Sequence, residues 1–195
     1  MGLDTLLYAE NAEQLSEELR TADSALIRRR RQVVCLSLVS ATCMGVVSAY
    51  QFGLIKHVPE LPLPGLDADK VDASPQAYEK LSTGDAFLGL VSYSVTMLLA
   101  AVGGIRRYQS HPLIPIALAA KAAGDAAQAA RLTRDQWVDH RAFCSWCLIA
   151  ATSTFAVVPA VVPELRAAAA TLRTRATWRL ARRCERRTTK SRREL

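Results

Sequence analysis

Two cysteines set three residues apart, Cys144 and Cys147, are the residues of this chain whose type and spacing best suit chemistry. They lie in the stretch HRAFCSWCLIAATSTF, residues 140–155, at the start of a long uncharged run. Residues i and i+3 of a helix share a face, so the two sulfurs could exist as a disulfide or as a dithiol. The pair therefore indicates thiol–disulfide chemistry.

The two cysteines are expected to differ in their surroundings. Cys144 is placed in the first turn of a helix, where free N–H groups and the positive end of the helix dipole favour a thiolate, and His140 and Arg141 add positive charge nearby. Cys147 is expected one turn deeper, about 4.5 Å along the axis. We therefore expect Cys144 to lie close to water and to be alkylated first, and Cys147 to lie close to lipid.

Two other interpretations of the pair stay open. Cysteine is often buried as a plain hydrophobic residue, so the pair could be inert packing. Cys-x-x-Cys is also half of a zinc site, but His140 is the only histidine near it in sequence, and we expect no metal. The other cysteines, Cys35, Cys43 and Cys184, fit no such pattern and are interpreted as structural or incidental.

Three long stretches without charged residues predict helices that cross a membrane. No Asp, Glu, Lys or Arg occurs in residues 32–55, 86–105 or 142–163. A helix needs about 20 apolar residues to cross the hydrocarbon core, and a buried helix of a soluble protein rarely stays uncharged on every face over such a length. The sequence therefore predicts an all-α integral membrane protein.

A further predicted helix, which begins at Pro112, completes a four-helix bundle. It is rich in alanine, which suits close helix packing in lipid. Lys121 and Asp125 are spaced i, i+4 and can pair inside the bundle, either as a structural pair or as a proton relay. The predicted spans are Val33–Ile55, Ala86–Ile105, the helix from Pro112, and Ala142–Pro163.

The basic residues predict how these helices are oriented. The chain has a net charge of +7, and most of the excess lies in Arg28–Arg31 and after Glu164, beside hydrophobic spans. Because such residues stay on the cytoplasmic side, this charge favours membrane lipid over nucleic acid as a partner. We expect both termini in the cytoplasm, with residues 1–31 as an arm, 32–165 as the membrane domain and 166–195 as a basic tail that could include a surface helix.

The loop over residues 56–85 is expected on the opposite side, because it carries three lysines against six acidic residues. Its first half is broken by prolines and a glycine, which exclude a regular helix. In its second half SPQAYEKLS, residues 74–82, predicts one short helix with proline at the first helical position.

Several segments together resemble the vitamin K epoxide reductase family of membrane thiol–quinone oxidoreductases, in its bacterial form, over about residues 30–165. The segments are LSTGDAFLGLVSY, PLIPIALAAKAAGDAAQAARL and, most specifically, RAFCSWCLIAATSTFAVVP. The resemblance implies a four-helix bundle around a quinone, ubiquinone or menaquinone, with the outer loop as an extracytoplasmic lid.

The resemblance also implies roles for particular residues. Cys147 matches the cysteine that interacts with the quinone, and Cys144 matches the one that exchanges disulfides. Phe87, Leu90 and Tyr93 fall near the segment that lines the quinone pocket. Tyr93 could donate a hydrogen bond to a quinone carbonyl or simply pack.

One departure from the family concerns the electron donor. Studied members carry a second cysteine pair in the loop after the first span, but residues 56–85 contain no cysteine. Either a partner thiol attacks Cys144 directly, as a thioredoxin-fold extracytoplasmic protein could do, or the chemistry is altered. The predicted function is oxidation of extracytoplasmic thiols and reduction of a membrane quinone. The alternatives are a non-catalytic membrane scaffold, and a quinone- or lipid-binding sensor with an inert cysteine pair.

Overall fold

The computed structural model describes residues 12–60, 62–78 and 83–193, and every regular element within these ranges is a helix. The only β-type pairing in the described ranges is one isolated bridge between Leu66 and Phe143. The expected all-α class is therefore confirmed for this part of the chain. The elements are α2 (Ala12–Thr21), α3 (Ala25–Gln51), α4 (Ala68–Asp72), the 3-10 helix η1 (Pro75–Tyr78), α5 (Asp85–Ala101), α6 (Arg107–Ser110), α7 (Leu113–Asp135), the π-helix η2 (Gln136–His140) and α8 (Ser145–Arg193).

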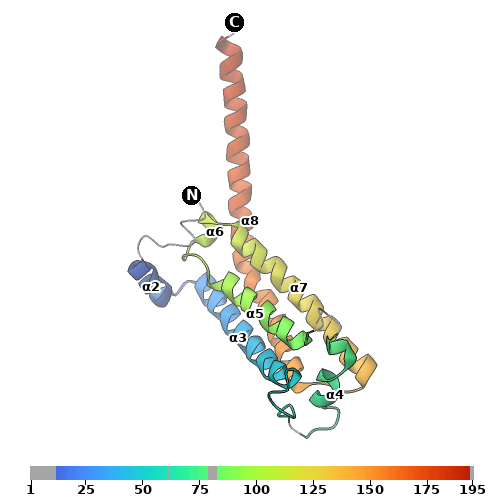
Figure 1. The fold of residues 1–195 in the computed structure, drawn as a ribbon. Coiled ribbons are helices and arrows are strands. Elements are labelled where there is room, and N and C mark those ends of the chain that lie inside the picture. The colour runs from blue at the N-terminus through green and yellow to red at the C-terminus, as the bar shows by residue number, and fades with distance from the viewer. Residues whose placement is uncertain (1–11, 61, 79–82, 194–195) are drawn as a thin grey trace.

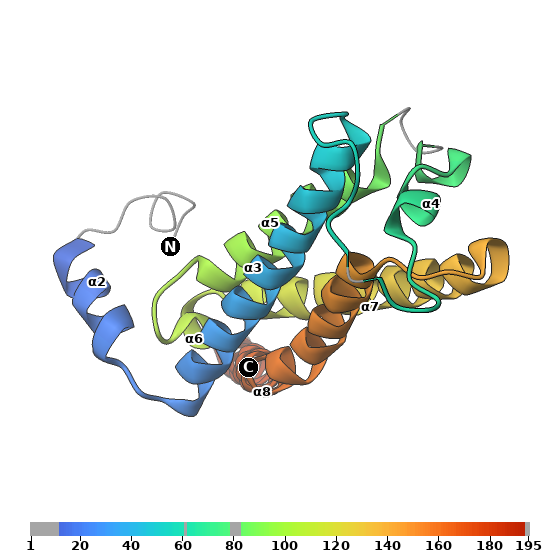
Figure 2. The same cartoon turned by 90° about the horizontal axis from the view of Figure 1, so that it is seen from below.

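The long helices pack against one another around α3 and α8 (Figure 1). Helix α3 packs on α5 and on α8, α7 packs on α8, and α5 also contacts α7. In the view from below in Figure 2, α2 lies beside one end of α3, while α4 lies near the other end, close to the start of α8. The loop that carries α4 thus reaches the end of the bundle at which the cysteine pair begins α8.

Among the described residues, two helices are long and apolar enough to cross a membrane. They are α3 and the Ser145–Trp178 part of α8, and α5 is a shorter apolar helix. Length and composition therefore support two of the predicted spans directly, whereas the arrangement with four spans stays a prediction.

The first two predicted spans have different ends in the structure. Helix α3 begins at Ala25 because the Ser24 side chain caps it, accepting a hydrogen bond from the Ile27 N–H at 3.3 Å. The basic cluster Arg28–Arg31 is therefore the first part of this helix and does not precede it. Helix α5 ends at Ala101, and Gly103 then turns the chain with a φ of 88°, a conformation that suits glycine.

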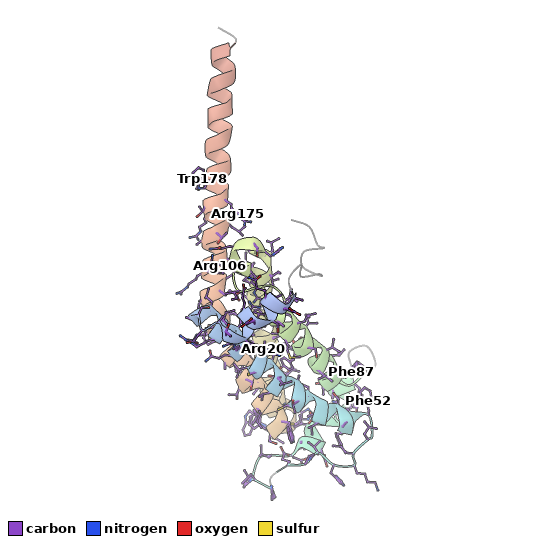
Figure 3. All side chains as sticks on the ribbon, turned by 90° about the vertical axis from the view of Figure 1, so that its left-hand side faces the viewer. Arg20, Phe52, Phe87, Arg106, Arg175 and Trp178 are labelled. Atoms are coloured by element: carbon purple, nitrogen blue, oxygen red, sulfur yellow. The ribbon has the colours of Figure 1, made fainter. Side chains whose placement is uncertain are left out.

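The helix of the last predicted span, Ala142–Pro163, continues well beyond Pro163, and the basic cytoplasmic tail over residues 166–195 stays a prediction. Helix α8 runs without interruption for 49 residues and includes both Pro159 and Pro163. Its residues after Pro163 include an alanine run and leucines, which have high helix propensity. The end of α8 projects beyond the packed helices in Figure 1, and Figure 3 labels Arg175 and Trp178 where it leaves them. The Arg175 guanidinium there still donates a hydrogen bond to the Gln109 carbonyl of α6.

Two buried arginines close the end of the bundle away from the cysteine pair. Arg107 has no exposed surface, and its guanidinium makes two hydrogen bonds to the Glu164 carboxylate, at 2.7 and 2.8 Å. It also donates to the carbonyls of Leu99, Ala100 and Val102 at the end of α5. Arg30 donates to five carbonyls between Ala100 and Gly104. These contacts satisfy carbonyls that a helix end leaves without partners.

In the outer loop, one helix was not predicted, and one predicted helix is described only in part. Helix α4 was not predicted; Asp67 caps it by accepting a hydrogen bond from the Lys70 N–H at 3.0 Å. The expected helix over residues 74–82 appears as η1, Pro75–Tyr78, and residues 79–82 lie outside the described ranges. Gln51 at the end of α3 joins these pieces, since its side-chain amide donates to the Asp72 carbonyl and to the Asp85 carboxylate.

Candidate active site

The fold brings Cys144 and Cys147 together at the beginning of α8, as the spacing predicts. Cys144 directly precedes the helix, and the Cys147 N–H in its first turn donates to the Cys144 sulfur at 3.4 Å. Both cysteines are free thiols. This is the arrangement of a dithiol that can close to a disulfide.

The turn before the pair is formed by the π-helix η2. Arg141, which follows it, adopts a left-handed conformation with a φ of 52°, and its guanidinium lies over the Trp137 ring at 5.6 Å. The Trp137 ring in turn stacks on Phe143. The Gln136 side chain then accepts a hydrogen bond from the Cys144 N–H at 3.2 Å. These contacts fix the backbone that presents Cys144.

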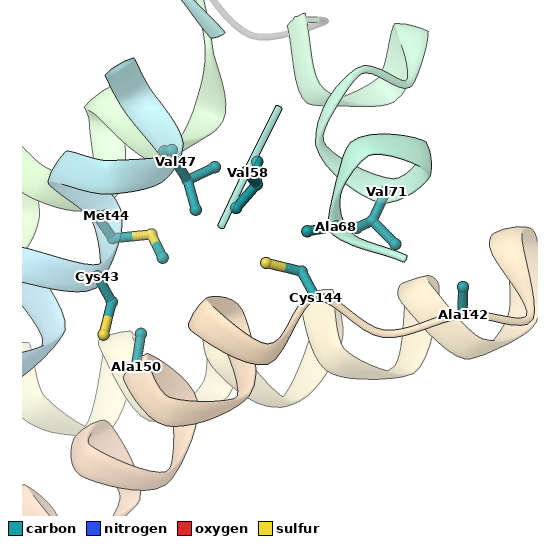
Figure 4. Close-up of a cluster of buried hydrophobic side chains, with 10 residues drawn as sticks. Cys43, Met44, Val47, Val58, Ala68, Val71, Ala142, Cys144 and Ala150 are labelled. Atoms are coloured by element: carbon teal, nitrogen blue, oxygen red, sulfur yellow. The ribbon is translucent and has the colours of Figure 1, made fainter. Parts of the chain in front are cut away.

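The prediction that Cys144 is the more exposed cysteine is wrong. Cys144 has no exposed surface, whereas Cys147 is partly exposed. Figure 4 shows the reason, because Val58, Ala68 and Val71 of the outer loop lie over the Cys144 sulfur. The sequence argument placed Cys144 by its depth along the helix and did not include the loop that folds over it.

The outer loop is held on the cysteine pair by backbone and side-chain hydrogen bonds. Phe143 donates its N–H to the Gly65 carbonyl at 2.8 Å, and its own carbonyl accepts from the Asp67 N–H at 3.0 Å. The Trp146 indole donates to the Pro59 carbonyl at 2.7 Å. We call residues 58–60 and 62–72, which make these contacts and cover Cys144, the lid.

Glu60 is the side chain that ties the lid to α8. One carboxylate oxygen accepts the Ser145 N–H and the other accepts the Ala68 N–H, each at 2.7 Å. A carboxylate at a helix N-terminus is stabilised by the unpaired N–H groups there. Glu60 therefore closes the lid and also places a negative charge beside the start of α8.

Asp72 of the lid is a third chemical group at the site. The Cys147 thiol donates to Asp72 Oδ1 with a separation of 3.7 Å, and the Asp72 residue is only 4% exposed. Burial raises the pKa of Asp72 to about 7, although hydrogen bonding to the two thiols opposes the shift. Nothing in the sequence pattern singled out this aspartate among the acids of the loop.

Asp72, Cys144 and Cys147 offer three ligand atoms that all lie within 4.8 Å of one another. Thiolates and a carboxylate could bind a thiophilic cation such as zinc, which takes similar ligands in other proteins. The expectation that the site holds no metal stays a prediction.

A cavity of about 450 Å³ opens beside Cys147. Asp72 and Tyr93 line it together with Cys147, and further walls come from α5, α7 and the start of α8. Of the three residues that the resemblance placed near a pocket, only Tyr93 is among the lining residues. Phe87 instead packs edge-on against Phe52 at the bundle end (Figure 3), and Leu90 packs against the buried cluster that contains Cys144.

The predicted pairing of Lys121 with Asp125 is confirmed. The ammonium lies 2.6 Å from the carboxylate, and both groups also contact the hydroxyls of Ser92 and Thr96 on α5. Such a network satisfies the charges inside a helix bundle, and it therefore supports the structural interpretation of this pair. Asp125 also lines the cavity.

The remaining cysteines do not contact the pair through hydrogen bonds in the described residues. Cys43 is buried in the same cluster as Cys144, but in Figure 4 its sulfur points toward Ala150, away from Cys144. Cys35 is exposed. The side chain of Cys184 lies outside the part of the chain whose side chains are described.

The described residues thus place a lid-covered dithiol beside a cavity and carry it on apolar helices. The chain belongs to the vitamin K epoxide reductase family, whose sequence model matches residues 31–162, more than half of its 195 residues. This membership supports a redox function and an association with membranes. No curated protein and no solved structure matches the chain.

Proposed function

We propose that the protein is a quinone-linked thiol oxidoreductase of the membrane, which oxidises extracytoplasmic thiols through Cys144 and Cys147. The observation that carries the proposal is the position of the pair, with Cys144 under a lid and Cys147 facing the cavity. A family whose members use quinones matches this part of the chain.

The cavity fits a quinone in size and lining. Its volume of about 450 Å³ lies within the range of about 300–1,000 Å³ that is usual for small-molecule pockets. Apolar residues such as Met44 and Leu88 form part of the wall, and the Tyr93 hydroxyl supplies a polar group. A bound quinone would accept two electrons from the pair and take up two protons on reduction. Cys147 is the cysteine placed to deliver the electrons, because it lines the cavity.

Cys144 would exchange disulfides with the electron donor. An attacking thiolate must line up with the sulfur that it strikes, and the closed lid prevents that approach, so the lid has to move before exchange. Because residues 56–85 contain no cysteine, the donor is a separate protein thiol, and a thioredoxin-fold protein would present one suitably. The lid then selects which donors reach Cys144.

The proposed arrangement in the membrane uses α3, α5, α7 and α8 as four spans around the cavity. The basic residues of α3 and of the C-terminal part of α8 support a cytoplasmic location for both termini, since such residues stay on the cytoplasmic side. The lid and the cysteine pair then face the other side of the membrane, where oxidising conditions favour disulfides.

The test is anaerobic reduction of ubiquinone and menaquinone analogues by the purified protein, with a dithiol as the electron donor. We expect turnover by the wild type and less than about a hundredth of it after Cys144→Ser or Cys147→Ser. Cys35→Ser, which removes an exposed cysteine away from the site, should leave turnover unchanged. Equal turnover by all four proteins, or none by the wild type, would favour an inert pair in a scaffold or sensor.

A further inference from the structure

Asp72 is a buried carboxylate that lacks the partners a charge requires. Its Oδ1 accepts one hydrogen bond, from the Cys147 thiol at 3.7 Å, and its Oδ2 is buried and receives none within the described part of the chain. Leaving an ionised carboxylate in such a position is costly, and binding a proton removes most of the cost. The two thiols supply acidic protons close to Asp72, because the three groups lie within 4.8 Å of one another.

The groups around Asp72 also favour the protonated form. Burial is the largest influence and raises the pKa of Asp72, and the negative charges of Asp85 and Glu60 raise it further. Only the neighbouring thiols of Cys144 and Cys147 lower the pKa of Asp72, and the hydrogen bond that the Cys147 thiol donates to Oδ1 favours the ionised form. Across the cavity, α7 and η2 contribute the charged or titratable residues Asp125, Arg131, Asp135, Asp139 and His140.

We propose that Asp72 is the catalytic group that accepts the thiol proton of Cys147 when the pair closes to a disulfide, and returns a proton when the pair is reduced. The inference rests on the proposed function in one respect, that the pair cycles between dithiol and disulfide. In the oxidation step two S–H bonds break and one S–S bond forms between Cys144 and Cys147. Two electrons pass to the acceptor, one proton moves to the Asp72 carboxylate, and the second proton leaves the site.

The direction of this proton transfer follows from the contacts. Once the disulfide forms, neither sulfur can donate a hydrogen bond to Asp72, so the influence that lowers its pKa is lost while burial remains. The pKa of Asp72 is therefore higher in the disulfide form than in the dithiol form. At a pH above 7 the carboxylate is mostly ionised beside the dithiol and becomes protonated beside the disulfide.

Counting protons released during oxidation tests this assignment without a quinone. Full-length protein with Cys35, Cys43 and Cys184 replaced by Ser would be oxidised anaerobically with ferricyanide in weakly buffered detergent, with a pH-indicator dye. Ferricyanide takes one electron per ion and no protons, so the dye reports every proton that leaves the protein. We expect about two protons per disulfide near pH 5.5, where Asp72 is protonated in both states, and a fall toward one near pH 8.

Asp72→Asn should release two protons at every pH, because an amide of the same shape cannot titrate. Asp69→Asn is the matched control, since it removes the same charge from the same short helix, and it should retain the fall toward one. Two protons from the control protein at every pH, or a proton still retained after Asp72→Asn, would overturn the assignment. If the Asp72→Asn protein does not fold, the assignment is tested by the number of protons released per disulfide at each pH in the protein that retains Asp72. A retained proton in a protein that fails to reduce quinones would contradict the proposed function and leave Asp72 as the proton acceptor.

Discussion

The Glu60 carboxylate and the backbone N–H of Ser145 are 85 residues apart in the chain and lie at hydrogen-bond distance, 2.7 Å, in the structure. Through this contact a residue of the outer loop is fixed to the first turn of the helix that carries Cys147. The second oxygen of the same carboxylate accepts the Ala68 N–H. One side chain therefore connects the first part of the lid to α4 and to α8. The reactivity of Cys144 is therefore linked to a residue that never touches its sulfur.

Replacing Glu60 should open the lid. Glu60→Ala removes both hydrogen bonds, and the loss of about 1.4 kcal/mol of lid stability would increase the open fraction about tenfold. We expect N-ethylmaleimide to modify Cys147 before Cys144 in the wild type, and to modify Cys144 about ten times faster in the variant. Peptide mass spectrometry after timed quenching measures both rates. Lys70→Ala, an exposed change in the same loop, should behave as the wild type, and a Cys144 that reacts first in the wild type would contradict a closed lid.

Replacing Cys147 should trap the electron donor. Cys147→Ser removes the thiol that resolves a mixed disulfide, so the donor should remain bound to Cys144 and appear as an adduct on a non-reducing gel. Replacing Cys35, Cys43 and Cys184 together by Ser should leave both trapping and turnover intact. Cys43 is the informative member, because it is buried in the same cluster as Cys144. Turnover that disappears with Cys43→Ser alone would reveal an internal relay and contradict direct attack by the donor.

Asp72 should make the folded protein less stable as the pH rises. Its pKa is about 7 when folded and near 3.8 when unfolded, so between these values the folded state holds a proton that the unfolded state has lost. The stabilising contribution is complete below about pH 4 and is lost as the pH rises through 7. Asp72→Asn should therefore match the wild type near pH 4 and have a Tm several degrees higher near pH 8, as measured by thermal unfolding in detergent.

Asp69, on the same short helix, should change the stability with pH in the opposite direction to Asp72. Partial burial acts to raise its pKa, but hydrogen bonds from the Val58 N–H and from His57 more than offset this, and the pKa is lowered. Its contribution is present above the unfolded pKa and is lost as the pH falls. Asp69→Asn should therefore lower the Tm at neutral pH. A higher Tm there would contradict the stabilising hydrogen bonds that Val58 and His57 make to the Asp69 carboxylate.

Removing Glu164 should destabilise the bundle at its other end. Glu164→Ala leaves the guanidinium of Arg107, which has no exposed surface, without its carboxylate partner. Leaving one partner of a buried ion pair unpaired costs about 3–5 kcal/mol, so we expect a large loss of thermal stability. The double variant Arg107→Met with Glu164→Leu should recover much of it. A single variant as stable as the wild type would show that water or lipid replaces the carboxylate.

The sequence predicts the helices and the cysteine pair well because both depend on local spacing. The uncharged stretches mark α3, α5 and the first part of α8, and the i, i+3 relation brings Cys144 and Cys147 together. The i, i+4 relation likewise pairs Lys121 with Asp125.

Contacts between distant segments could not be predicted in the same way. Nothing near Asp72 in sequence indicates that it meets residues 75 positions later, and nothing near Cys144 indicates the loop that covers it. The continuity of α8 was missed for a different reason. The predicted span ends at Pro163, and its sequence does not indicate that the helix continues, because a helix with strong formers on both sides can accommodate proline.

The covered position of Cys144 changes what limits its reaction with other molecules. A sulfur at the surface reacts with every oxidant in proportion to collisions, so its selectivity rests on chemical reactivity alone. A sulfur that is uncovered only during brief openings reacts at a rate set by how often the cover lifts and how long it stays open. A higher concentration of a small diffusing oxidant then increases its reaction rate with Cys144 only a little. A protein that binds the open form prolongs the exposure of the sulfur and so reaches it more often. Selection among reaction partners of Cys144 therefore depends on how often the lid opens and on how long it stays open.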